Sequence, residues 1–316
     1  MAERGSRTLR SAIGSLVDRV TGRESRRLRA RIRELRSDLA ESRRLATTHA
    51  PVRSEYSALA PDPSAALSLF EGSWSSQLPG RDGPGRAELF ADPRIDWLVE
   101  QTGSLRGAHV LELGPLEGGH TWMLEQRGAR VTAVEANHAA FLRCLTVKNL
   151  LGMSSEFVLG DFARALPAGG PWDLVVASGV LYHMVEPERL VSDVAAASDR
   201  VFLWTHYFLD DPAAWHPDAA ARLGTKWRTD DQVERRCNGV DLRLVPMLYE
   251  EALGWSGFCG GPERFSLWMR REELLGLLRS FGYDDLRIAF DRPDGPNGPS
   301  FAVFASRTEP RAARGS

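Results

Sequence analysis

The sequence predicts an α/β fold: a doubly wound, mostly parallel seven-stranded sheet with an N-terminal helical extension and an inserted cap. Short apolar runs alternate with helical segments between about residues 85 and 306, as expected when crossover helices join parallel strands. The runs are bounded by Gly, Asp or Arg, which is typical of buried parallel strands. The alternation stops between residues 207 and 262, and this stretch is rich in Trp and Tyr. It therefore predicts an insertion.

The expected elements follow from these runs and from the turn residues between them. The predicted strands cover residues 108–113, 130–135, 156–160, 173–178, 200–205, 285–290 and 299–306. The predicted helices lie near residues 88–102, 119–127, 137–150, 187–196 and 271–282. In such a sheet, ligands bind outside the carboxyl ends of the strands, so the strand ends are the first place to look for a site.

The segments differ in composition, and the differences predict a division of the chain. Residues 46–85 are rich in Ser, Pro, Gly and Ala, which is typical of a linker. We expect a basic helical extension (1–50), a linker and lid segment (51–105), a ligand-binding core (106–206), a cap that contacts the substrate (207–262), the C-terminal part of the main sheet (263–308) and a disordered tail (309–316).

Charge is distributed unevenly along the chain. Residues 1–45 carry a net charge of +7, and the remaining residues carry −9. Two narrow apolar stripes at helical spacing lie within the basic segment: Leu9, Ile13, Leu16 and Val20, then Leu28, Ile32, Leu35 and Leu39. We expect these helices to pack on the body or on a sister chain as a homodimer; contact with a membrane surface or a nucleic acid is the alternative. The acidic body argues against nucleic acid as the main partner.

The sequence contains no stretch of about 18 apolar residues that could span a membrane. The N-terminus also lacks the apolar region of a secretory signal, so we expect a cytoplasmic protein. The three cysteines, Cys144, Cys237 and Cys259, lack the spacing of a metal or redox motif. They are expected to be free thiols in a reducing compartment.

A glycine-rich turn follows the first predicted strand and opens a helix. Gly114 and Gly118 would let the backbone approach a ligand closely, where a Cβ atom would be in the way. Glu112 lies at the mouth of the turn and Glu117 lies inside it. Two carboxylates are unfavourable for a pyrophosphate, but they suit a ligand with an ammonium and a sulfonium group. The turn therefore favours S-adenosylmethionine over NAD.

Acidic residues at the ends of the next two strands support this interpretation. Glu135 follows the second strand and can accept hydrogen bonds from both ribose hydroxyls. Asp161 follows the third strand and can accept a hydrogen bond from the adenine amine, with Phe162 as an apolar wall. Each acid alone could be an ordinary strand-end or helix-cap residue. The expected donor-binding residues are Glu112, Gly114, Pro115, Glu117, Gly118, Glu135, Ala136, Asp161, Phe162 and Ser178.

On these residues the chain resembles the class I S-adenosylmethionine-dependent methyltransferases. The resemblance covers residues 108–206 well and residues 263–306 loosely, and it implies a Rossmann-like fold and methyl transfer. The family pattern is acid-x-Gly-x-Gly-x-Gly. Here the middle glycine is replaced by Leu116, while Gly114 and Gly118 are retained.

The segment 177–183, Ala-Ser-Gly-Val-Leu-Tyr-His, is similar to one in the tRNA wobble-uridine carboxymethyltransferases and their uncharacterised relatives. Residues 266–268 and 281–283 also resemble the C-terminal end of that group. Those enzymes carry a Trp-Arg-Lys-Gly-Pro-Phe segment that helps hold the carboxylate of their donor, whereas residues 70–74 here read Phe-Glu-Gly-Ser-Trp. The missing basic pair implies plain methyl transfer to something other than tRNA.

Two histidines are candidates for a general base that deprotonates the acceptor. His183 follows the fourth strand and His206 ends the fifth, so both should face the edge of the sheet where ligands bind. We expect His183 to be the base, because it follows a short turn directly after its strand. The alternative for each is a histidine that bonds the backbone and shapes a loop. No metal is expected, because His206, Asp210, Asp211 and His216 lack a known ligand spacing.

The aromatic residues predict an acceptor pocket, with core packing of the cap as the alternative. The expected substrate-binding residues are Tyr182, Trp204, Tyr207, Trp255 and Trp268. Arg235 and Arg236 could hold an anionic group or form a solvated pair. The sequence thus predicts methyl transfer to a small-molecule acceptor, such as O- or N-methylation of a natural product or sugar. The alternatives are a tRNA-modifying methyl- or carboxymethyltransferase and a non-catalytic binding protein.

Overall fold

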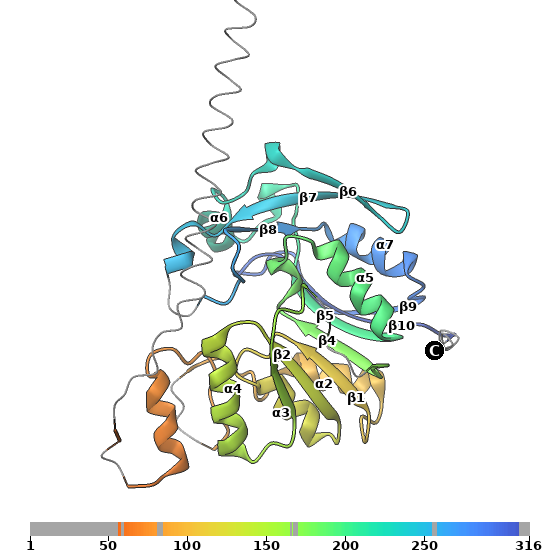
Figure 1. The fold of residues 1–316 in the computed structure, drawn as a ribbon. Coiled ribbons are helices and arrows are strands. Elements are labelled where there is room, and N and C mark those ends of the chain that lie inside the picture. Colours follow the sequence, from red (N-terminus) through yellow and green to blue (C-terminus); the bar gives the residue numbers. More distant parts are fainter. Residues whose placement is uncertain are drawn as a thin grey trace, which may run out of the picture. The chain divides into compact units, whose positions relative to one another are not determined.

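A seven-stranded sheet forms the centre of the computed structural model, which describes residues 56–57, 60–80, 85–164, 166, 170–254 and 258–309 (Figure 1). Its strands are β1 (His109–Leu113), β2 (Arg130–Glu135), β3 (Glu156–Leu159), β4 (Leu174–Ser178), β5 (Arg200–His206), β9 (Asp285–Arg292) and β10 (Ser300–Ser306). They lie in the order β3-β2-β1-β4-β5-β10-β9. Only β10 is reversed relative to the other six strands and pairs antiparallel with both β5 and β9, so the predicted doubly wound, mostly parallel sheet is confirmed.

Capping residues in the sequence mark the ends of several helices. The α-helices are α2 (Pro93–Thr102), α3 (Gly119–Gln126), α4 (His138–Leu151), α5 (Pro187–Ala197), α6 (Pro217–Leu223) and α7 (Arg271–Ser280). The short 3-10 helices are η1 (Pro63–Phe70), η2 (Leu181–His183), η3 (Pro212–Ala214), η4 (Thr229–Asp231) and η5 (Glu250–Gly254). Asp92 caps α2 ahead of a proline, Asn137 caps α4, and Gly152 ends α4 in the left-handed conformation.

The two faces of the main sheet are buried under different helices. Alternate residues of β1 show this: Val110 belongs to a core formed with α2, α3 and α4, and Leu111 belongs to a core formed with α5 and α7. Because successive side chains of a strand point to opposite faces, apolar runs such as this one are buried on both sides. The rigid sheet positions the strand ends that carry the candidate site.

A second, antiparallel sheet follows β5 and corresponds to the predicted insertion. It consists of β6 (Val233–Cys237), β7 (Val240–Leu248) and β8 (Phe265–Trp268), in that order. Asn238 and Gly239 join β6 to β7 with positive φ values of 46° and 84°, as a tight hairpin requires. Since β8 pairs with β7, we propose that the cap extends to residue 268 rather than to the expected boundary at 262.

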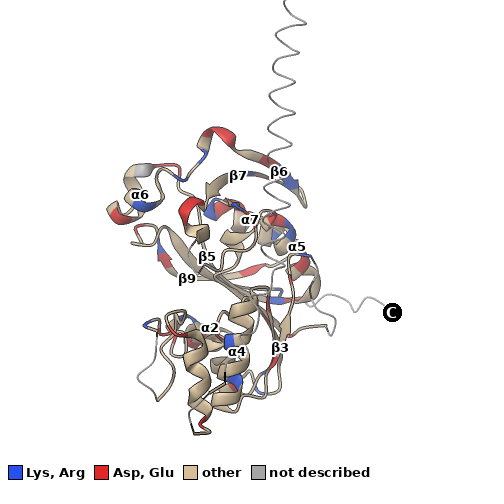
Figure 2. Cartoon of the chain, turned by 60° about the vertical axis from the view of Figure 1, so that its left-hand side comes forward, with Lys and Arg blue, Asp and Glu red and all other residues tan. Residues whose placement is uncertain are grey.

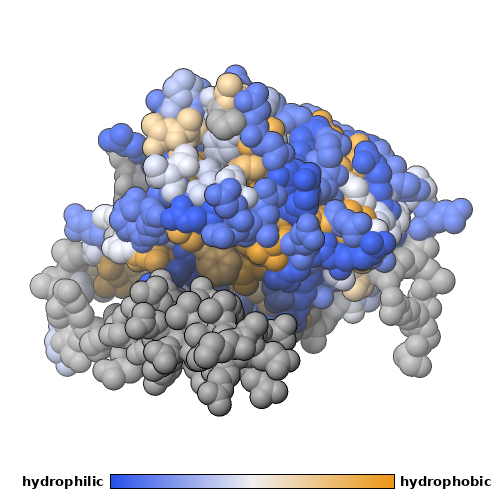
Figure 3. Space-filling model, turned by 90° about the horizontal axis from the view of Figure 1, so that it is seen from above, coloured by the Kyte–Doolittle hydropathy of each residue, from blue (hydrophilic) through white to orange (hydrophobic). Residues whose placement is uncertain are grey.

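The aromatic residues of the insertion form its core. Phe208, Trp215, Tyr249 and Trp268 are buried in one cluster with residues of β7. Seen from above, the molecule is mainly hydrophilic, with apolar residues visible over smaller areas (Figure 3). Acidic and basic residues both occur on the second sheet and on α6 (Figure 2). The second sheet and α6 therefore do not have the uniform positive charge expected of a surface that binds a phosphate backbone.

Several expectations concern residues that the structure does not describe. The helical extension 1–50 with its proposed dimer contact, the tail from residue 310, and Trp255 lie outside the described residues. Within the described ranges, none of the helices is long and apolar enough to cross a membrane. Cys144, Cys237 and Cys259 are free cysteines, as expected.

Candidate active site

The candidate site lies at the carboxyl ends of β1, β2, β4 and β5. The strands β1, β2 and β3 follow one another towards one edge of the sheet, whereas β4 and β5 lie on the other side of β1. The direction in which successive strands are added therefore reverses between β1 and β4. Ligands of doubly wound folds bind at this reversal. The turn after β1 and the residues that end β2, β4 and β5 therefore meet at one edge.

The glycine-rich turn after β1 has a left-handed backbone at three positions. The φ values are 66° at Gly114, 57° at Leu116 and 79° at Gly118. A Cβ atom at Gly114 would lie 2.5 Å from Cγ1 of Val180, so a side chain does not fit there. Leu116 occupies the place of the family's middle glycine and has a left-handed conformation, at a cost of about 1–2 kcal/mol. A glycine would adopt this conformation without that cost.

Two buried carboxylates lie beside this turn. Glu135 accepts hydrogen bonds from the backbone N–H of Leu116 at 3.1 Å and of Asn137 at 2.8 Å. Glu112 is 2% exposed and accepts a hydrogen bond from the hydroxyl of Thr121. Burial raises the pKa of both carboxyls, and the charge of Glu135 raises the pKa of Glu112 further. A cation bound beside them would stabilise their charged forms.

Glu117 has a structural role that the sequence did not predict. Its carboxylate is fully buried and accepts hydrogen bonds from the backbone N–H of Ser75 at 2.9 Å and of Ser76 at 2.7 Å. Nε of Arg143 lies 3.2 Å from the same carboxylate. Both oxygens thus hold Ser75 and Ser76 beside the turn. The expectation that Glu117 also contacts the donor stays a prediction.

The remaining expected donor residues surround the same edge. Asp161 follows β3, is partly exposed, and accepts a hydrogen bond from the backbone N–H of Ala163. Phe162 is buried beside it. Ser178 ends β4, and its hydroxyl is buried without a hydrogen-bond partner among the described residues. Pro115 is buried in the turn, and Ala136 is exposed after Glu135. The unpartnered hydroxyl and the two buried carboxylates fit a polar, cationic ligand such as S-adenosylmethionine.

His206 is held by the backbone of a distant loop. Its Nδ1 lies 3.0 Å from the carbonyl oxygen of Pro299, so Nδ1–H donates and the lone pair of the neutral ring is on Nε2. The imidazole stacks on Trp268 with ring centres 5.4 Å apart. Burial lowers its pKa, so the ring is neutral near pH 7. His206 therefore has the protonation state and the tautomer of a general base.

His183 is a weaker base than the sequence suggested. Its Nδ1 lies 2.7 Å from the hydroxyl of Tyr249. Burial, together with the charge of His206, lowers the pKa of His183 to about 3. A general base works best when its pKa is near the operating pH, so a group titrating so low accepts a proton poorly. The geometry therefore favours His206 over His183.

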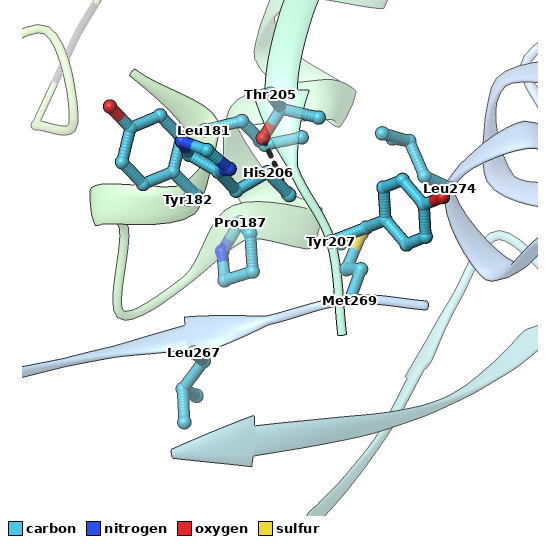
Figure 4. Close-up of a pocket in the computed structure, with 9 residues that line it drawn as sticks. All are labelled: Leu181, Tyr182, Pro187, Thr205, His206, Tyr207, Leu267, Met269 and Leu274. Carbon is cyan, nitrogen blue, oxygen red and sulfur yellow. Dashed lines mark hydrogen bonds between the residues drawn. The ribbon is translucent and has the colours of Figure 1, made fainter. Parts of the chain in front are cut away.

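Three of the expected aromatic residues surround His206. The Tyr182 ring centre lies 4.7 Å from that of His206, and the Trp204 ring centre lies 5.1 Å from it. Trp268 completes the group. Figure 4 shows Tyr182 close to His206, with a small crevice lined in part by both.

Tyr207 lies on the other side of β5 from His206 but lines the same small crevice, so its expected contact with the substrate stays a prediction. Its ring points away from His206 towards Leu274 (Figure 4). It packs on Phe301, and its hydroxyl is directed at Asp291. The reason is the alternation of side chains along a strand, which places neighbouring residues on opposite faces.

Two residues of this region were missed by the sequence analysis. Arg94, in the first turn of α2, has its guanidinium carbon 4.3 Å from the centre of the Trp204 ring. Tyr249, after β7, bonds His183. Neither has a local sequence signal, because each reaches the site from an element distant in the chain.

The residues weighed as metal ligands have other partners. Asp210 pairs with Arg270, and His216 caps α6 by accepting a hydrogen bond from the backbone N–H of Asp218. Among the described residues there is also no group of three His, Cys, Asp or Glu side chains arranged to hold a metal ion. Arg235 pairs with Glu188, and Arg236 pairs with Asp241.

Comparisons with known proteins agree with this geometry. Residues 111–197 match a family described as a methyltransferase domain. The chain is 30% identical over 101 residues to tRNA U34 carboxymethyltransferase of Colwellia psychrerythraea, covering 32% of this chain and 31% of that protein. It is 33% identical over 138 residues to ribosomal RNA small subunit methyltransferase A of Sphingopyxis alaskensis, covering 42% and 44%. The chain thus spans less than half the length of these relatives.

Solved structures extend the comparison to the fold. The N-terminal domain of EvdMO1 with SAH bound is 21% identical, with a TM-score of 0.58, and the match covers 77% of this chain and 95% of that one. At this identity the likeness shows the fold alone. Together, the matched methyltransferase domain, the strand order with its single reversed strand and the turn after β1 agree with the fold of a class I S-adenosylmethionine-dependent methyltransferase.

Proposed function

We propose that the chain transfers a methyl group from S-adenosylmethionine to an oxygen or nitrogen of a small-molecule acceptor. One observation carries the proposal. The buried carboxylates Glu112 and Glu135 lie at the carboxyl ends of two adjacent parallel strands, and His206 with its aromatic neighbours ends a strand at the same edge of the sheet. A site for a cationic donor thus adjoins a site for a flat acceptor.

The donor would be held mainly by side chains at the strand ends. Glu135 can accept hydrogen bonds from ribose hydroxyls in addition to those from its two backbone donors, because an ionised carboxylate has about four acceptor sites. Glu112 supplies negative charge beneath the turn, and the unpartnered hydroxyl of Ser178 can bond the donor from β4. When bound, S-adenosylmethionine supplies a methyl carbon already activated by sulfonium. The protein's main task is therefore to hold the acceptor in line with it.

His206 is proposed to remove the acceptor's proton. The Pro299 carbonyl fixes the Nδ1–H tautomer and leaves Nε2 as the proton acceptor. Tyr182 and Trp268 restrict the orientation of the ring by packing on it. His183, bonded to Tyr249, would position Tyr182 and the loop after β4. This assignment differs from the sequence-based expectation, in which His183 was the base.

Donor binding tests the proposal through Glu135. We expect S-adenosylhomocysteine to bind the protein in a calorimetric titration and to bind Glu135→Gln at least tenfold more weakly. A charge-assisted hydrogen bond contributes about 1.5–3 kcal/mol, and about 1.4 kcal/mol corresponds to tenfold. Glu156→Gln is the control, because Glu156 is exposed at the start of β3. Equal affinity in both variants and the parent protein would remove Glu135 from the site.

A tRNA substrate is the second candidate, because several relatives are named tRNA U34 carboxymethyltransferases and the segment 177–183 resembles theirs. Against it, the chain from residue 46 onwards is acidic. Filter binding with unfractionated tRNA at 50 and 200 mM salt distinguishes the two. Retention that falls steeply with salt would favour tRNA, whereas no retention at 50 mM salt would favour a small molecule.

The N-terminal segment is proposed to act apart from the donor site, in line with the division of the chain between Ala58 and Leu59. Deleting residues 1–45 should leave the affinity for S-adenosylhomocysteine unchanged, since Glu112 and Glu135 lie far along the chain. Sedimentation of the same variant tests the proposed homodimer. A folded variant that no longer binds the donor would contradict the division.

A further inference from the structure

Arg94 is a cation in the aromatic site that the proposed methyl transfer does not use. Its side chain is 19% exposed, and its guanidinium carbon lies 4.3 Å from the centre of the Trp204 ring. Trp204 in turn contacts Tyr182 and His206. The arginine thus stacks on one wall of the proposed acceptor site.

The guanidinium is fixed in a way that leaves one of its nitrogens available. Nε bonds both oxygens of Asp92, at 2.9 and 3.0 Å, and Nη2 bonds one of them. Asp92 is buried and also bonds Nε2 of His120 at 2.8 Å. These partners hold the pKa of Asp92 well below its usual range, so the pair with Arg94 persists at neutral pH. In the described structure, Nη1 makes no hydrogen bond, and its two N–H groups can bind a ligand.

The charge of Arg94 acts inside the site. It lowers the pKa of both Tyr182 and His206, and Arg222 lowers the pKa of His206 as well. The principal charges acting on this histidine are therefore positive. A field of this sign attracts an anion and disfavours a second cation.

We infer that the methyl acceptor is an aromatic or similarly flat carboxylate, with its carboxylate on Nη1 of Arg94 and its ring beside Trp204 and Tyr182. This inference rests on the proposed function and names its substrate class. Ring faces suit a flat acceptor, and a guanidinium held by Asp92 loses little freedom when it binds a carboxylate.

A bound carboxylate would also improve His206 as a base. Burial is the main cause of the lowered pKa of His206, and the charges of Arg222 and Arg94 lower it further. An anion bound to Arg94 would offset the contribution of that arginine. Catalytic competence would then depend on the charge of the acceptor.

The experiment compares 4-hydroxybenzoate with 4-hydroxybenzamide, which match in shape and differ in charge. Each is titrated into the full-length protein saturated with S-adenosylhomocysteine, and binding is measured by calorimetry. We expect the carboxylate to bind at least tenfold more tightly than the amide. Arg94→Gln should abolish this preference. Arg94→Lys, which keeps the charge, should still bind the carboxylate several-fold more tightly than the amide. Arg279→Gln, an exposed arginine of α7, is the matched control and should behave like the parent.

The affinity for S-adenosylhomocysteine is measured for every variant and reports that the variant is folded. Equal binding of the two compounds, binding of neither at millimolar concentration, or a preference that survives in Arg94→Gln would overturn the inference and leave the proposed function intact. Failure of the parent protein to bind S-adenosylhomocysteine would instead contradict the proposed function itself.

Discussion

The proposed donor side and the proposed acceptor side of the site are built in different ways. The proposed donor side depends on short segments of sequence, each consisting of a strand and the residues that follow it, with Glu112 next to the last residue of β1 and Glu135 last in β2. The acceptor side combines residues from separate parts of the chain: Arg94, Tyr182, His206, Tyr249 and Trp268. Local motifs therefore reveal the first, whereas tertiary packing decides the second.

The two sides also differ in what holds their functional groups. Glu135 is fixed by backbone N–H groups of the turn and of the start of α4. His206 is fixed by ring contacts and by a carbonyl of the loop before β10. A backbone-held donor side should tolerate changes to the acceptor side, and the following predictions test this independence.

The largest effect is expected at His206. Replacing His206 with Ala should lower kcat by about 10²–10⁴-fold, which is the usual range for loss of a general base. Affinity for S-adenosylhomocysteine should stay within a few-fold, because the donor side is held separately. The rate is measured with a phenolic acceptor that the parent protein turns over.

His183→Ala is the matched comparison for His206. It should lower kcat less, since His183 titrates too low to be an effective base at pH 7. A larger loss at His183 than at His206 would restore the sequence-based assignment. Little loss in either variant would indicate an acceptor that needs no base, such as an amine.

Replacement of Gly114, in the turn after β1, should destabilise the fold more than replacement of Gly152, which has a similar backbone conformation. Gly114→Ala should destabilise the fold by about 2–4 kcal/mol, through left-handed strain and a clash with Val180. Gly152→Ala has a similar φ of 65° but open space around it, and should cost only about 1–2 kcal/mol. Urea denaturation measures both. Equal losses would show that the close packing at Gly114 is unimportant.

Stability should depend on pH through His183 on the acceptor side. The pKa of His183 is lowered to about 3 in the folded protein. When the pH falls below the ordinary histidine pKa of about 6.5, the unfolded chain therefore binds a proton that the folded chain does not. Stability is therefore lost as the pH falls. For a half-buried group we expect a loss of about 1–2 kcal/mol between about pH 7 and 5.

The variant His183→Asn isolates this contribution from those of other groups. Urea denaturation at both pH values should show that the variant loses less stability than the parent protein on acidification. An identical loss in the two proteins would mean that His183 titrates normally in the folded state.

The smallest effect is expected at Leu116. Leu116→Gly restores the family's middle glycine and removes left-handed strain, but it also removes a partly buried side chain. These effects oppose each other, so stability should change by less than about 1 kcal/mol and donor affinity by less than about threefold. A much larger loss of stability would show that the leucine side chain holds the turn in place.

The sequence predicted the fold well because its signals are local. The apolar runs, their bounding residues and the glycine-rich turn each depend on neighbours along the chain, and the seven predicted strands are present. The side of the sheet on which Tyr207 lies could also have been deduced from the sequence. Successive side chains of a strand point to opposite faces, so Tyr207 lies opposite Trp204 and His206.

Other features could not be deduced from local patterns. Glu117 is bound by backbone groups that lie about forty residues earlier in the chain, at Ser75 and Ser76. Arg94 reaches Trp204 from α2, and the tautomer of His206 depends on Pro299. Each of these contacts exists only after the sheet and its helices have packed together.

Hydrogen exchange measured by mass spectrometry tests the central claim most directly, since it locates the donor on the intact protein. Saturating S-adenosylhomocysteine should slow exchange at the turn after β1 and at the start of α4, including the N–H groups of Leu116 and Asn137 that now bond Glu135. Exchange in β6 and in the outer part of β7 should be unchanged. Protection confined to the second sheet, with none at the turn, would contradict a donor site at the ends of β1 and β2.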